Sequence, residues 1–185
     1  MTTSESCNNK EAAVTANRRG SAHFEFPNDL EIVLTREFDA PIQLVFDVLT
    51  KPEHVRKTIA PYGEEVTTCS IDLRVGGDYH FVFVTGDGRE MSFRGTFLEV
   101  EPPTRTVETW VFDGWPGVEA VETVELREAD GVTKLTHTLA FPDQAGRDHM
   151  TGTDGLVANY DNVEALVRSL LDPKQTVAGG RSHTS

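Results

Sequence analysis

His137 is the side chain of this sequence whose type and setting best suit acid–base chemistry. It lies in residues 133–141, where it alternates in step with Leu135 and Leu139. Successive side chains of a strand point to opposite faces, so we expect His137 to face inward with these apolar neighbours. A neutral imidazole there needs a polar partner. It is either a satisfied core histidine or a polar contact and proton relay within a pocket.

Two glutamates on neighbouring predicted strands could supply a partner acid or base. Glu108 alternates in step with Trp110, and Glu122 alternates in step with Val124 and Leu126. Either carboxyl could therefore point inward, where burial would raise its pKa and suit it to acid–base work. The other interpretation is a water-exposed position at the rim of the sheet, where neither glutamate has a chemical role.

Aromatic side chains gather on one face of three predicted strands, within residues 79–83, 91–93 and 110–112. We assign these faces to the concave side of a curved sheet, where they form either ordinary core or the wall of an apolar pocket. A strand and a helix are expected to complete that wall. The candidate ligand-binding residues are Tyr79, Phe81, Phe83, Met91, Phe93, Trp110, Phe112, His137, Leu139, Leu156 and Tyr160.

Composition and charge argue against several classes of function. The formal net charge of −13 disfavours nucleic acid and anionic membrane surfaces as partners, since both are bound by clusters of Lys and Arg. No apolar run reaches the ~18 residues of a membrane span. The histidines and the cysteines, Cys7 and Cys69, lack the spacing of a zinc site, and no nucleophile motif occurs. We therefore expect no metal, no cofactor and no dedicated catalytic residue.

The cysteine usage and the first residues bear on the compartment. Two cysteines fit a reducing environment. The stretch that follows Met1 has neither the basic nor the apolar region of a secretory signal. We therefore expect a cytoplasmic protein, as a monomer or a homodimer, whose partner is a small hydrophobic molecule.

Hydrophobic periodicity orders the chain as a strand, two short helices, six further strands and a long helix. A period of two marks residues 30–38 and six segments between residues 65 and 141, and the short turns between these segments favour antiparallel hairpins. Pro41 and Pro52 stand where short helices begin, and apolar residues recur at helical spacing from Leu156 to Leu171. The sequence thus predicts an α+β fold in which a curved, seven-stranded antiparallel sheet wraps the last helix and leaves a cavity beneath it.

Residues 28–172 are expected to form a single domain. Residues 1–27 are rich in Ser, Thr, Asn and charge without an apolar period, and residues 173–185 include a Gly-Gly pair. Such segments bury too little apolar surface to offset the entropy of ordering, so both are expected to be flexible tails. Phe24 and Phe26 could still pair with an edge strand.

Several segments in a fixed order resemble one known family. They are residues 36–41 (REFDAP), 45–47 (VFD), 50–55 (TKPEHV), 73–79 (LRVGGDY), 94–103 (RGTFLEVEPP), 108–110 (ETW) and 130–135 (DGVTKL). Together with the closing helix, they are similar to the SRPBCC (START-like) superfamily, in the subgroup of the activator of heat-shock-protein-90 ATPase. The resemblance covers about residues 30–171. It implies a helix-grip fold with an internal apolar pocket.

The resemblance leaves three functions open, because this superfamily serves several chemistries. The leading hypothesis is non-catalytic binding of a small hydrophobic ligand. The second is an enzyme similar to polyketide cyclases or dehydratases, which would use His137 with an inward Glu or Tyr as acid and base. The third is a co-chaperone or stress-response protein with a chaperone partner. We rank it last, since only about 27 tail-like residues precede the first predicted strand where full activators carry another domain.

Overall fold

The computed structural model describes residues 22–115, 117–151 and 155–172. The predicted tails, residues 1–27 and 173–185, lie almost entirely outside this part of the chain. The helices are α1 (Ile42–Thr50), α2 (Pro52–Thr58), α3 (Gln144–Met150) and α4 (Gly155–Leu171). The strands are β1 (His23–Glu25), β2 (Glu31–Phe38), β3 (Glu65–Ile71), β4 (Asp78–Val84), β5 (Glu90–Glu101), β6 (Arg105–Phe112), β7 (Glu119–Ala129) and β8 (Val132–Ala140).

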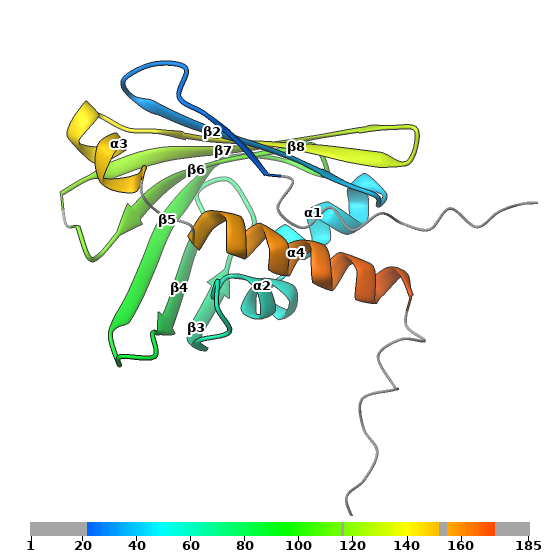
Figure 1. The fold of residues 1–185 in the computed structure, drawn as a ribbon, viewed down its shortest axis with the longest axis horizontal. Helices are drawn as coiled ribbons and strands as arrows, with labels where there is room; N and C mark the ends of the chain where they lie inside the picture. The colour runs from blue at the N-terminus through cyan, green and yellow to red at the C-terminus, as the bar shows by residue number, and fades with distance from the viewer. Residues whose placement is uncertain (1–21, 116, 152–154, 173–185) are drawn as a thin grey trace, which may run out of the picture.

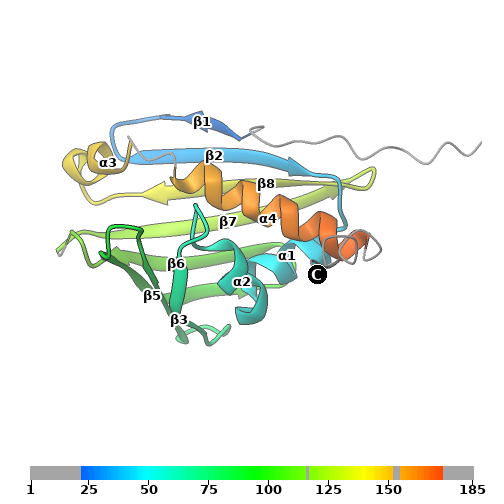
Figure 2. The same cartoon turned by 60° about the horizontal axis from the view of Figure 1, so that its bottom comes forward.

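One curved antiparallel sheet carries all the strands, in the order β1-β2-β8-β7-β6-β5-β4-β3. Figure 1 shows α4 lying across one face of this sheet. In Figure 2, α1 and α2 lie beside α4 on the same face. These three helices also contact one another. The predicted α+β helix-grip fold is therefore confirmed.

Local backbone features explain how the strands turn and how the sheet bends. Asp130 and Gly131 both have positive φ (53° and 77°) in the two-residue connection between β7 and β8. A tight hairpin of this kind requires left-handed residues, and Asp-Gly supplies them at low cost. The pairing register shifts once in β3 and once in β5. Such bulges bend a strand, so they help to curve the sheet around α4.

Two elements differ from the sequence prediction. The sheet has eight strands rather than seven, because His23–Glu25 pairs with the open edge of β2. Phe24 packs against buried core residues, which offsets the cost of ordering this short segment. The short helix α3 stands where only an irregular approach to the last helix was expected. Its start is stabilised by Asp143, whose side chain accepts a hydrogen bond from the Gly146 amide at 2.8 Å.

The solid core lies beneath the C-terminal half of α4. Val163 and Val167 of α4 pack there with Leu34 of β2, Leu135 of β8 and Val45 of α1, all of them buried. The apolar stripes predicted for α1 and α4 supply these contacts. The strand residues of this cluster come from β2, β7 and β8, while α2 contacts β3 at the other edge of the sheet.

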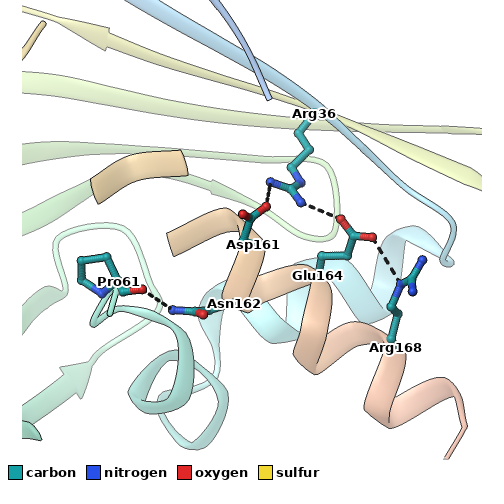
Figure 3. Close-up of polar contacts among 6 residues, drawn as sticks. All are labelled: Arg36, Pro61, Asp161, Asn162, Glu164 and Arg168. Atoms are coloured by element: carbon teal, nitrogen blue, oxygen red, sulfur yellow. Dashed lines mark hydrogen bonds and ion pairs between the residues drawn. The ribbon is translucent and has the colours of Figure 1, made fainter. Parts of the chain in front are cut away.

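A buried arginine ties α4 to the sheet. The Arg36 side chain, fully buried on β2, lies 2.8 Å from Asp161 and 2.6 Å from Glu164, both on α4 (Figure 3). Arg168 meets the same Glu164 at 3.2 Å. Asn162, the residue after Asp161, donates hydrogen bonds to the carbonyls of Ala60 and Pro61 in the connection after α2 (Figure 3 shows the Pro61 contact). These contacts hold α4 over the sheet and bring the chain after α2 against it.

Candidate functional site

A cavity of about 900 Å³ lies between the sheet and the helices α2 and α4. This volume falls near the upper end of the ~300–1,000 Å³ typical of small-molecule pockets. Every one of the candidate ligand-binding residues lines the cavity: Tyr79, Phe81, Phe83, Met91, Phe93, Trp110, Phe112, His137, Leu139, Leu156 and Tyr160. Strand alternation therefore predicted the geometry of the wall. That these residues bind a ligand stays a prediction.

The aromatic part of the wall is continuous across three neighbouring strands. Phe93 of β5 stacks on Phe83 of β4, with ring centroids 5.9 Å apart, and on Phe112 of β6 at 5.0 Å. Trp110 meets Phe93 at 5.7 Å. Cross-strand pairs of this kind stabilise a sheet while they present a broad apolar surface. The rings suit the flat or elongated body of an apolar molecule.

A polar cluster interrupts this apolar wall at β7 and β8. His137 is 3% exposed, and its Nε2 lies 2.8 Å from Oε1 of Glu122. Its Nδ1 lies 3.0 Å from the Tyr160 hydroxyl. Nδ1 and the Tyr160 hydroxyl are hydrogen-bonded, and which of them donates depends on the tautomer of the imidazole. Nε2 is close to Glu122 but has no hydrogen-bond partner of good geometry among the described residues. The sequence analysis named each of these groups, and the structure joins them into one set.

Glu108 lies directly opposite Glu122 in the β6–β7 register, and both side chains line the cavity. Burial raises the pKa of Glu108 well above its ordinary value, and the nearby charge of Glu122 raises it further, while a hydrogen bond from Thr106 acts against both. The sequence allowed one inward glutamate. Both face the cavity, and the raised pKa favours the protonated form of the Glu108 carboxyl.

Two buried tyrosines adjoin this cluster in different ways. The pKa of Tyr160 is raised by burial and by the charges of Glu122 and Glu108. The same causes raise the pKa of Tyr79. The Tyr79 hydroxyl, however, donates to the carbonyl oxygen of Thr109 at 3.0 Å. Tyr79 therefore presents its ring to the cavity while its hydroxyl is bonded to the backbone, whereas the hydroxyl of Tyr160 is hydrogen-bonded to His137.

The connection after α2 forms part of the cavity mouth. Tyr62 lines the cavity and is 69% exposed, as expected for a residue at an opening. His54 of α2 is not among the lining residues. The backbone of this connection is held by α4, because Asn159 donates to the carbonyl of Thr58 at 2.7 Å.

A larger side chain at position 95 would not fill the cavity, although Gly95 alternates in step with the cavity-lining Phe93. A Cβ atom at Gly95 would lie 1.7 Å from the Thr109 carbonyl oxygen and 2.7 Å from the Tyr79 ring. A side chain at Gly95 therefore cannot fill the pocket, because the neighbouring backbone already occupies that space. Sequence alternation gives the face of a residue but not the distance to the next strand.

Gly95→Ala should consequently lower the free energy of unfolding by about 3 kcal/mol, because the β5 and β6 backbones must separate to admit one methyl group. Gly86→Ala is the matched control, since nothing lies within 4 Å of a Cβ at that exposed turn. Chemical denaturation of both variants measures the difference. An unfolding midpoint for Gly95→Ala equal to that of Gly86→Ala would contradict the close approach.

Neither a metal site nor a membrane span emerges from the described residues. Within residues 22–115, 117–151 and 155–172, no three His, Cys, Asp or Glu side chains gather closely enough to hold a metal ion. In the same ranges, no helix is long and apolar enough to cross a membrane.

Comparison with protein families places this chain in a known group. Residues 39–168 match the family described as Activator of Hsp90 ATPase homolog 1-like protein. The chain belongs to this family. The resemblance inferred from the sequence motifs is thereby confirmed. Membership supports a ligand-binding or co-chaperone-like role in general terms. A comparison with curated proteins gave no match.

Solved structures from bacteria share the fold. A protein of Rhodobacter sphaeroides superposes with a TM-score of 0.74 at 20% identity, over 80% of this chain and 99% of that one. A protein of Nitrosomonas europaea gives 0.68 at 25% identity, over 79% and 99%. A solution structure from Arthrobacter aurescens gives 0.70 at 17% identity, over 88% and 98%. The coverage shows that these neighbours match this chain over nearly their whole length.

Proposed function

We propose that this protein binds a small, largely apolar molecule in its internal cavity. The cavity of about 900 Å³ with its aromatic wall is the observation that supports the proposal. A void of this size lined by Phe, Trp and Met forfeits the packing contacts that a filled core would make. Binding an apolar body would restore those contacts and remove the rings from water.

A cavity-filling substitution tests the proposal. Val124→Phe should weaken binding of the neutral fluorophore N-phenyl-1-naphthylamine about tenfold or more, because Val124 lines the cavity and a larger ring would occupy part of it. The measurement is a fluorescence titration. Native mass spectrometry of the protein as purified from cells would then identify any retained molecule.

Val121→Phe is the matched control on the same strand. Val121 is 37% exposed and does not line the cavity. The control should bind the fluorophore as the unaltered protein does. No saturable binding to the unaltered protein, or equal weakening in both variants, would count against the proposal.

The contacts of His137 support a second candidate function, an enzyme of the polyketide cyclase or dehydratase kind. A histidine between Glu122 at 2.8 Å and Tyr160 at 3.0 Å could exchange a proton with a bound molecule. We rank this below binding, because a relay of this kind also satisfies a buried imidazole. The variant that separates the two functions is His137→Leu.

The description of the family supports a third candidate, a chaperone partner. The family is named after an activator of the Hsp90 ATPase. This candidate predicts that the purified chain stimulates ATP hydrolysis by Hsp90. Absence of stimulation at saturating concentration would remove it.

A further inference from the structure

Two side chains on the cavity wall, Glu108 and His137, each have a buried polar atom without a hydrogen-bond partner among the described residues. For His137 this atom is Nε2, which already lies against a carboxylate, so Glu108 has the greater capacity left for a ligand. Glu122 is in close contact with His137, which is in turn bonded to the Tyr160 hydroxyl. The Tyr79 hydroxyl is bonded to a backbone carbonyl. Within the described part of the chain, Oε2 of Glu108 is buried and has no hydrogen-bond partner. A buried polar atom in this condition costs stability unless something satisfies it.

The groups around Glu108 determine which form of its carboxyl is stable. Phe97 lies opposite it on β5, and Trp110 follows it on the same face of β6. The titratable groups that interact with it from the other elements are Tyr79 of β4, Glu122 of β7 and Tyr160 of α4, and His137 of β8 lies beyond Glu122 on the same cavity wall. No Lys or Arg is among them. The head group of Arg105, the nearest arginine in sequence, pairs with Glu99 and Glu125 instead.

A neutral carboxyl in this setting has one proton to donate. The burial and the charge that raise its pKa both favour this form. A donor that faces an apolar cavity pairs best with a neutral acceptor oxygen, because an ionised ligand would itself have to be desolvated. A carbonyl oxygen on an apolar body meets this requirement.

We propose that Glu108 donates a hydrogen bond to a carbonyl oxygen of the cavity's ligand, and that the ligand is therefore an apolar carbonyl compound. This inference rests on the proposed binding function. It selects the class of molecule bound, because a hydrocarbon of the same shape would leave Glu108 unsatisfied, whereas a carbonyl compound would not. Discrimination through one buried polar group is a common source of ligand specificity.

The test compares two probes of matched shape, 2-acetylnaphthalene and its hydrocarbon analogue 2-isopropenylnaphthalene. At about pH 6 the ketone should bind about tenfold more tightly than the hydrocarbon. The preference should be greatest below the pKa of Glu108 and should decline as rising pH ionises the carboxyl. Titrations followed by Trp fluorescence or calorimetry measure both affinities across the pH range.

Variants of Glu108 isolate its contribution. Glu108→Gln retains a donor that does not titrate, so the preference for the ketone should persist and become independent of pH. Glu108→Leu should bind both probes equally. Glu119→Gln makes the same chemical change at an exposed position of β7 and should behave as the unaltered protein does.

The outcomes separate this inference from the proposed function. If both probes bind equally to the unaltered protein, the inference is overturned and the binding function stands. A pH dependence that survives in Glu108→Gln would assign the effect to another group, such as His137, and would also overturn it. Tighter binding of 1-(2-naphthyl)ethylamine than of the ketone would show that the cavity selects a cation. If no probe binds, the proposed function fails together with the inference.

Discussion

Arg36→Met should lower the free energy of unfolding by about 3–5 kcal/mol, the usual cost of removing one member of a buried ion pair. The substitution leaves Asp161 and Glu164 side by side on α4 without the guanidinium that lies 2.8 Å and 2.6 Å from them. Domains of this kind are stable by only about 5–15 kcal/mol, so the loss is a large fraction of the total. Denaturant titration followed by Trp fluorescence measures it.

Two controls show whether the loss comes from the buried charges. Glu37→Met removes a charge from the neighbouring, exposed position of β2 and should change stability by less than about 1 kcal/mol. The triple variant Arg36→Met, Asp161→Asn, Glu164→Gln removes the charges on both sides and should recover part of the lost stability. A loss below about 1 kcal/mol for Arg36→Met alone would show that the network does not anchor α4.

Arg36 also shows where prediction from sequence stops. Alternation on β2 correctly placed it on the same face as Leu34 and Phe38, yet nothing local explains why a guanidinium occupies a core position. The explanation is Glu164, which lies 128 residues away in the chain. Contacts between distant elements depend on the folded topology, so a pattern within one strand does not contain them.

The residues that line the cavity were easier to predict from the sequence than the contact between Arg36 and Glu164. Most of the cavity wall consists of strand residues whose inward or outward direction follows from a period of two, and Leu156 and Tyr160 follow from the apolar stripe of the last helix. The joint contacts of Glu122, His137 and Tyr160 were not predictable, since they depend on register. The β7–β8 register places Val124, rather than Glu122, opposite His137, so the contact is a diagonal one.

The remaining fold differences have equally local causes. β1 was assigned to a tail because only three residues pair, and a strand this short has no readable period. Phe24 is the one residue of this strand that packs against the core, and one apolar residue is too few to show the alternation typical of a strand. The seven residues of α3 include a glycine and interrupt the approach to α4, so they lack the apolar stripe by which helices are recognised.

His137→Leu is the substitution expected to separate a carrier from an enzyme. It removes the hydrogen-bond partner of the Tyr160 hydroxyl and the contact of Glu122, which should lower the free energy of unfolding by about 1–3 kcal/mol. In a carrier, the affinity for N-phenyl-1-naphthylamine should be nearly unchanged, because the apolar wall stays intact. In an enzyme, turnover should fall about 100-fold or more. We expect the first result.

A double-mutant cycle shows whether the stability cost arises from the polar cluster. Tyr160→Phe removes the hydroxyl that His137→Leu leaves without this hydrogen-bond partner, so the double variant should lose less stability than the sum of the single losses. The expected coupling is about 0.5–3 kcal/mol. Thr136→Leu, the next residue on β8 and on the opposite face, should show no coupling to Tyr160→Phe. Additive losses for His137 and Tyr160 would mean that their 3.0 Å contact contributes nothing to the fold. The cluster would then be retained for what it does to a bound molecule, and the enzyme hypothesis would gain where the carrier hypothesis lost.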